Sequence, residues 1–159
     1  MDKWHSENSN VQIDSSRAVL RQADLGGAIL QSANLRGTDL KTANLTGATL
    51  KKADLCEANL SRANITLADL SGAAFESANL KETTVRGSNL GKAFLHKANL
   101  KGSDLSKALL LFANLSWVNL TKANFGDADL TGIDLRHVRM WETNLTGASL
   151  MKANLSKAD

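Results

Sequence analysis

The chain has 159 residues and a mass of 17.0 kDa, which suits one domain large enough to bury a continuous core. Hydrophobic residues make up 43% of the sequence and charged residues 22%, so the chain is too apolar to be disordered. The net charge is only +3, and the single cysteine, Cys56, cannot form an internal disulfide, which excludes a disulfide scaffold.

The N-terminal residues 1–17 carry no repeat and no apolar stretch resembling a signal peptide. Among them, Trp4, Val11 and Ile13 could fold over the open end of the following domain as a cap. The longest apolar run, residues 108–113, is far too short to cross a bilayer. We therefore expect a separate N-terminal segment and a soluble, cytoplasmic protein that does not contact membranes.

From residue 18 onward, a period of five residues is unbroken. Every position divisible by five from 20 to 155 is apolar, and 23 of these 28 sites are Leu. Two residues earlier Ala fills 20 of 28 sites, and the residue between is Asn or Asp at 19 of 28. Eight of the eleven glycines fall two residues after the Leu position. The repeat is therefore Ala-Asn/Asp-Leu-x-x, and it makes residues 18–159 a single domain.

This period fits neither a helix nor a flat strand. Five residues at about 100° each advance about 140°, so the leucines of a helix would share no face. In extended backbone, the three-residue step from Leu to the next Ala would turn that Ala to the opposite face. The chain must therefore turn once per pentapeptide, with Gly able to supply positive φ and Asn or Asp able to bond nearby backbone. Turns of one hand produce coils that pair in parallel at about 4.8 Å around a column of Leu and Ala.

The number of sides does not follow from the period alone. Asparagines recur every 20 residues at positions 59, 79, 99 and 119, which favours four pentapeptides per coil and a stacked amide ladder. Four-sided coils would also stack two pairs of opposite charges, Arg62 with Glu82 and Lys122 with Glu142.

The repeat resembles that of the pentapeptide-repeat proteins, whose signature A(D/N)LXX is matched by residues 33–37 and 53–57, for example. The resemblance covers residues 18–159. It implies an all-β fold, a right-handed quadrilateral β-helix of about seven coils and roughly 34 Å in length. Family members, many of them from photosynthetic bacteria, have diverse and mostly unassigned roles. Some quinolone-resistance members imitate duplex DNA and bind a type II topoisomerase.

Residues typical of catalysis do not cluster in this sequence. His5, His96 and His137 have no partner at metal-ligand spacing. Asp129 and Asp134 occupy the Asn/Asp slot on consecutive faces, and the repeat explains them better than a catalytic pair does. The sequence therefore predicts no enzyme, no catalytic or metal site and no cofactor.

Charge patterning argues against nucleic acid as a partner. Lys41, Lys81 and Lys101 share one column, but Ser61 interrupts it, so we expect a solvated face. Imitation of DNA would need a strongly acidic surface, whereas the pI is near 9.1. A DNA-mimicking regulator of a type II topoisomerase is therefore a disfavoured alternative, and an enzyme comes third.

Outward apolar residues gather where the repeat predicts polar ones. Phe94 and Leu109 replace Asn or Asp, while Leu111, Phe112 and Trp117 fill corner positions. All five lie within 24 residues, and four-sided coils would bring them together. Contiguous apolar patches often bind partners, although such residues can also pack on one another without one. We expect a noncatalytic interaction scaffold or structural solenoid with an unidentified protein partner.

A weaker second group lies near the C-terminus, where Trp141 is outward and Arg136, His137 and Arg139 are close in sequence. The repeat continues to residue 159 without a capping segment, whereas solenoids normally end in polar units. The inward residues of the last coil would then be uncovered: Met140, Leu145, Leu150 and Leu155. Because such an end exposes unpaired backbone groups, we expect a homodimer through the C-terminal coil; a chain that stops short of its cap is the alternative.

Overall fold

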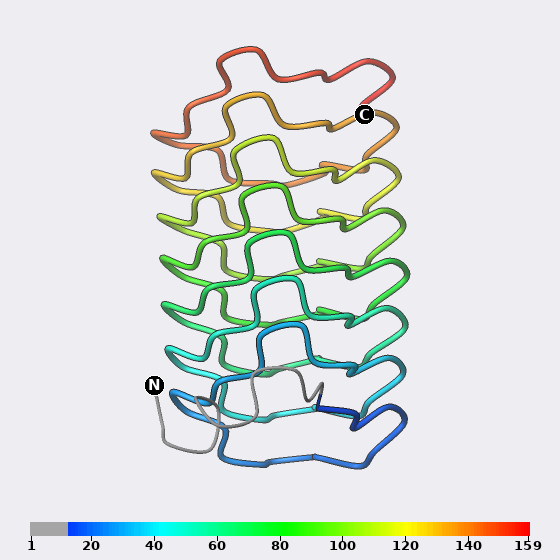
Figure 1. Ribbon diagram of the computed structural model, residues 1–159. Helices are drawn as coiled ribbons and strands as arrows, with labels where there is room; N and C mark the ends of the chain where they lie inside the picture. The colour runs from blue at the N-terminus through cyan, green and yellow to red at the C-terminus, as the bar shows by residue number, and fades with distance from the viewer. Residues whose placement is uncertain (1–12) are drawn as a thin grey trace.

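The computed structural model describes residues 13–159, so the predictions for Trp4, His5 and Val11 lie outside the described residues. The described chain winds into a stack of coils with the C-terminal coil at the top of Figure 1. Every parallel β-bridge joins residues 20 apart, from Asp14 with Asn34 to Asp134 with Asn154. Four pentapeptides therefore make one coil, which confirms the predicted four sides.

The coils span residues 18–37, 38–57, 58–77, 78–97, 98–117, 118–137 and 138–157. We number the four faces by their inward residues: face 1 contains position 20 and every twentieth residue after it, and faces 2, 3 and 4 start at 25, 30 and 35. Corner 1 follows face 1, and so on. The backbone pairing begins ahead of Ala18, because Asp14 already pairs with Asn34 and Ile13 packs against the core.

Each side of a coil is a single bridge residue between turns, and the described residues contain no helix and no longer strand. Accordingly, nothing in residues 13–159 has the length and apolar character of a membrane-spanning helix.

All corners share one turn conformation. The second corner residue has φ between 56° and 74° at 29 successive corners, from Arg17 to Lys157. The next amide then closes the turn, as Ala23 does by donating to the carbonyl of Leu20 at 3.1 Å. Glycine supplies this conformation at eight corners, as predicted, but 21 corners use residues with side chains. Each of those residues costs roughly 1–2 kcal/mol, which the bonds between coils offset.

Asn and Asp complete the hydrogen bonding of the backbone. In a consensus pentapeptide three N–H groups bond to neighbouring coils and a fourth closes the turn. The fifth, on the first corner residue, donates to the Asn or Asp side chain of its own pentapeptide, as Lys81 does to Asn79 at 3.2 Å. This bond is present at all 19 Asn/Asp sites from 24 to 154. The repeat thus satisfies every backbone donor it contains.

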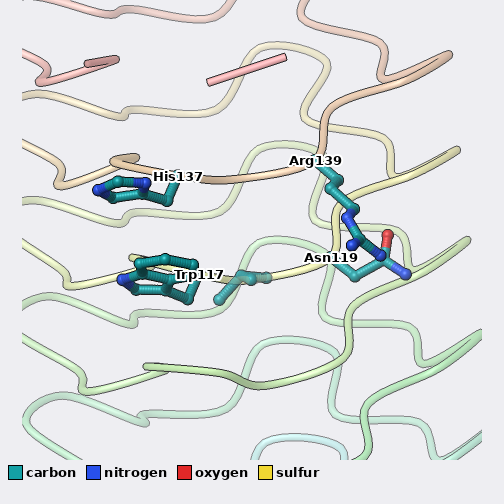
Figure 2. A pocket seen from close by; sticks show the side chains of 5 residues that line it. Trp117, Asn119, His137 and Arg139 are labelled. Carbon is teal, nitrogen blue, oxygen red and sulfur yellow. The ribbon is translucent and has the colours of Figure 1, made fainter. Parts of the chain in front are cut away.

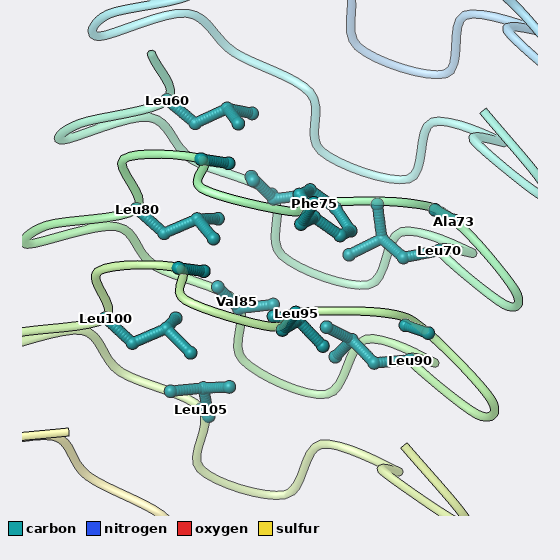
Figure 3. Close-up of a cluster of buried hydrophobic side chains, with 14 of the residues drawn as sticks. Leu60, Leu70, Ala73, Phe75, Leu80, Val85, Leu90, Leu95, Leu100 and Leu105 are labelled. Atoms are coloured by element: carbon teal, nitrogen blue, oxygen red, sulfur yellow. The ribbon is translucent and has the colours of Figure 1, made fainter. Parts of the chain in front are cut away.

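The inward residues form a dry core. Side chains at the Leu positions from 35 to 135 are at most 2% exposed, which confirms the inward prediction. Figure 3 shows Leu60, Leu80 and Leu100 stacked on one face. Where a hydroxyl replaces the inward Ala, it bonds to a backbone carbonyl, as Thr83 does to that of Leu60 at 2.8 Å. No buried polar side-chain atom among the described residues lacks a partner.

The predicted stacking of side chains between coils is present in part, and one step of the predicted amide ladder, from Asn79 to Asn59, is hydrogen-bonded. Asn79 donates to Asn59 at 3.2 Å, and Asn59 donates to Asp39 at 3.1 Å. Two ion pairs follow the same 20-residue step: Arg62 with Glu82 at 2.7 Å and Lys122 with Glu142 at 3.4 Å.

Candidate interaction surface

Apolar side chains cross two faces of the rod in the fourth and fifth coils. We call them the apolar strip, defined as Phe94, Leu109, Leu111, Phe112 and Trp117. Phe112 is 60% exposed, Phe94 and Trp117 are each 56% exposed, and Leu109 is 46% exposed. Leu111 is half-buried, less exposed than its outward position suggested.

Backbone pairing sets the positions of Phe94 and Leu109. Phe94 lies on face 4 between Ala74 and Asn114, and the small side chain of Ala74 leaves the ring uncovered on that side. Leu109 lies on face 3, where it pairs with Asn89. Corner 3, which carries Leu111 and Phe112, joins the two faces. The strip therefore wraps one corner of the rod.

Phe112 rests against the next coil. A Cβ atom added to Gly132 would lie 2.5 Å from Cδ1 and 2.6 Å from Cε1 of Phe112, so the ring lies directly over that glycine. The missing side chain at Gly132 makes room for the ring, which is buried on one side and open to solvent on the other.

Trp117 ends the strip at corner 4. Figure 2 shows its ring stacked on that of His137 in the next coil. The ring centroids are 4.2 Å apart and the angle between the ring planes is 8°. The 20-residue step between coils places the two rings in one column. The pair, together with Val118, Asn119 and Arg139, lines an open pocket of about 280 Å³ on face 1.

The second group, near the C-terminus, is divided among three positions on the rod. Trp141 is 72% exposed at corner 1, on the other side of face 1 from His137. Arg136 is held by Asp134, with Nη2 donating to Oδ2 at 2.8 Å. Arg139 is exposed on face 1. The structure therefore does not gather these residues into one cluster.

The C-terminal coil is less covered than the coils before it. Met140, Leu145 and Leu150 are half-buried, and Leu155 is 41% exposed. Met140, Leu145 and Leu150 pack against the core, and no further coil among the described residues covers them.

The two neighbouring aspartates and the cysteine within residues 13–159 have pKa shifts opposite to those that catalysis would need. The Arg136 side chain bonds Asp134 and lowers the pKa of that carboxyl, and Thr131 does the same for Asp129. A general acid needs the opposite shift. Burial raises the pKa of the Cys56 thiol, which disfavours the reactive thiolate.

The two histidines within the described residues show no metal chemistry. Nδ1 of His96 lies 2.9 Å from the Ser116 hydroxyl, and His137 stacks on Trp117. Residues 13–159 contain no group of three or more His, Cys, Asp or Glu that could hold a metal ion.

Comparison with known proteins agrees with this geometry. A profile described as pentapeptide repeats, in eight copies, matches overlapping segments that together cover residues 16–159. A comparison with curated protein sequences found no match.

Among solved structures, alr5209, a pentapeptide repeat protein from Nostoc PCC 7120, is 40% identical over 54% of this chain and 69% of its own, with a TM-score of 0.51. Rfr23 from the cyanobacterium Cyanothece 51142 is 29% identical, with a TM-score of 0.54 over 60% of this chain and 62% of its own. Trypsin-treated QnrB1, a plasmid-mediated fluoroquinolone resistance protein, is 20% identical, with a TM-score of 0.64 over 93% of this chain and 81% of its own. The chain therefore belongs to the pentapeptide-repeat family and has its right-handed quadrilateral β-helix fold.

Proposed function

We propose that this protein is a noncatalytic interaction scaffold whose protein partner binds the apolar strip. The observation that supports the proposal is the exposure of Phe94, Phe112 and Trp117, each more than half open to solvent within two adjacent coils. Aromatic residues are enriched among those that dominate binding energies, and truncating such an anchor typically costs 2 kcal/mol or more, about 30-fold in affinity. The partner covers these rings and the neighbouring Leu109.

Phe112→Ser tests this proposal, and the chain offers a matched control in Leu67→Ser. Both residues occupy the second corner position, with φ of 57° and 58°, and both are at least 60% exposed. Each also lies over a glycine of the next coil, Gly132 and Gly87 respectively. Leu67 is at corner 2, away from the strip. The two substitutions therefore cost the fold similar amounts and differ in the surface they remove.

The measurement is quantitative affinity capture from host extract with the parent and both variants, after melting curves have verified their folding. We expect a protein retained by the parent and by Leu67→Ser to be lost with Phe112→Ser. Purified partner should then show an affinity at least tenfold weaker for Phe112→Ser. Equal binding by all three proteins would exclude the strip as the binding surface.

Imitation of DNA is not favoured by any feature of the described surface. The likeness to QnrB1 is a likeness of fold at 20% identity, and the chain carries a net charge of +3. A mimic of duplex DNA needs a continuous negative face.

A second copy of the chain is a further candidate partner, through the coil 138–157. The observation that favours it is the partial exposure of four inward side chains, with Leu155 at 41%. Replacing Leu150 and Leu155 with Lys should abolish a weak dimer in sedimentation equilibrium. A constant mass of about 17 kDa for the parent from micromolar to hundreds of micromolar would contradict self-association.

We also propose that the protein acts in the cytoplasm, since its only cysteine is a free, buried thiol and no disulfide stabilises the coils. Fractionation of host cells tests the location, and recovery with an exported fraction would contradict it.

A further inference from the structure

Corner 1 carries one lysine or arginine in each of the six coils between residues 18 and 137. We call these residues the basic edge: Arg21, Lys41, Arg62, Lys81, Lys101 and Lys122. The residue directly after the Leu position of face 1 is basic in four of these coils, and it is Ser61 and Thr121 in the other two. The second residue of the same corner, Arg62 or Lys122, supplies the cation in both places. All six side chains are exposed, and at about 4.8 Å per coil the row is about 24 Å long.

The basic edge has more cations than any other corner of the rod, and it has one in each of six consecutive coils. The six cations share corner 1 with only two acids, Glu82 and Glu142, which leaves a net +4. Corner 3 has the same net charge of +4, but its four lysines lie in only three of the seven coils: Lys51, Lys52, Lys92 and Lys152. Successive cations lie well within the Debye length of about 10 Å at 0.1 M salt. A long anion beside the edge therefore interacts with several of them at once.

Four cations of the edge form ion pairs, including Arg21 with Asp39 and Lys122 with Glu142, but the Arg21 and Lys122 side chains stay 63% and 57% exposed. Arg62 and Lys81 both contact Glu82, at 2.7 and 3.3 Å, but the cationic side chains are 61% and 47% exposed. Pairs this exposed contribute little and exchange readily. Lys41 and Lys101 have no carboxylate within 4.0 Å among residues 13–159. Their charges are the most available to an incoming anion.

The shape and composition of the edge narrow the ligand class. The corner is convex and one cation wide, so it matches a single chain of charges better than a flat surface. None of the twelve corner 1 residues in these six coils is aromatic, so the bases of a single-stranded nucleic acid would have nothing to stack on there. We propose that the basic edge binds a flexible linear polyanion that lacks aromatic groups, of which inorganic polyphosphate is the simplest example.

The test compares two double variants of the full chain with equal net charge. Lys41→Gln with Lys101→Gln removes the two unpaired cations of the edge, whereas Lys92→Gln with Lys107→Gln removes two exposed cations from corners 3 and 2. All four positions are solvent-exposed, so both variants should fold, which melting curves check. Binding of inorganic polyphosphate is measured by calorimetry between 50 and 200 mM salt.

We expect the parent to bind with an affinity that falls steeply with salt. If each cation contributes about 0.7 to the slope of log affinity against log salt, as for single strands, reducing six contacts to four lowers the slope by about a third. If the parent and the Lys41→Gln/Lys101→Gln variant bind equally at 1 M salt, the variant should bind about 25-fold more weakly than the parent at 0.1 M salt. The control variant should keep the parental slope.

Three results would overturn the proposal. The first is equal weakening in both double variants, which would indicate that only net charge matters. The second is no binding of polyphosphate by the parent at 50 mM salt. The third is tighter binding of a single-stranded oligonucleotide of the same charge, or of anionic vesicles, which would assign the edge to a nucleic acid or a membrane instead.

Discussion

Replacing Leu70 with Asn and with Asp tests how the core column is built. Leu70 lies inward on face 3 and is 1% exposed, and the 20-residue step places it between Leu50 and Leu90, both at most 1% exposed. Figure 3 shows Leu70 and Leu90. Removing a buried leucine side chain typically costs 2–5 kcal/mol, and leaving the new amide of Leu70→Asn without partners adds roughly 1–3 kcal/mol. Leu70→Asn should therefore lose about 3–8 kcal/mol of unfolding free energy at any pH between 4.5 and 6.5.

Leu70→Asp adds a dependence on pH. A carboxyl held among leucines keeps its proton well above the ordinary Asp pKa of about 3.9, whereas the unfolded chain releases it there. The folded state then binds the extra proton, so raising the pH favours unfolding. The free energy of unfolding should fall by about 1.4 kcal/mol per pH unit between the two pKa values.

The assay is urea unfolding followed by far-UV circular dichroism at pH 4.5, 5.5 and 6.5. Lys51→Ala, on an exposed corner residue, is the control and should change stability by less than about 0.5 kcal/mol. The inward assignment fails if Leu70→Asp is as stable as the parent, or if it matches Leu70→Asn at all three pH values. If Leu70→Asp is unfolded at pH 6.5 while Leu70→Asn is still folded, the result agrees with the inward assignment of Leu70.

Two further predictions concern the corners and their ion pairs. Hydrogen bonds from Arg136 hold the pKa of Asp134 below its ordinary 3.8 in the folded state, so this contribution to stability is present above about pH 4 and is lost as the pH falls through the folded pKa. Melting temperature should therefore decline between pH 4 and pH 2, and a constant value would contradict the pairing. Gly132→Ala should melt below Gly47→Ala: both have positive φ, but only at Gly132 would the new Cβ displace the Phe112 ring. Equal melting temperatures would mean that the ring does not rest there.

Most of the fold could be predicted because each pentapeptide imposes the same physical requirements on the chain. The inward Leu at every fifth residue predicts the core, and the 20-residue recurrence of Asn predicts four pentapeptides per coil. The hydrogen bond that the Lys81 amide donates to the Asn79 side chain was predictable only in kind, as a polar side chain that steadies a turn. The sequence does not reveal that this amide is the one donor the coils leave unpaired.

The surface was harder to predict, because the direction of each side chain at a corner depends on the coil beside it. Leu111 was expected to be as outward as Phe112, yet it is half-buried. The sequence pattern alone does not show the basic edge, because Arg62 and Lys122 are the second residue of their corners whereas Lys41 is the first. The first and second residues of a corner lie at the same corner of the same coil. A cation at either position therefore joins the same row in space, although the two positions differ in sequence.

Phe112 and the basic edge should act independently, because corners 1 and 3 are diagonally opposite in a four-sided coil. A consensus pentapeptide satisfies its backbone donors through its own Asn or Asp and through the coils on either side, so an exposed corner side chain can change without disturbing the opposite corner. Phe112→Ser should therefore leave the affinity for polyphosphate and its salt slope unchanged. Lys41→Gln with Lys101→Gln should leave capture of the protein partner unchanged. If either variant weakened both interactions, the partner would have to span both corners, and the apolar strip and the basic edge would be parts of one site.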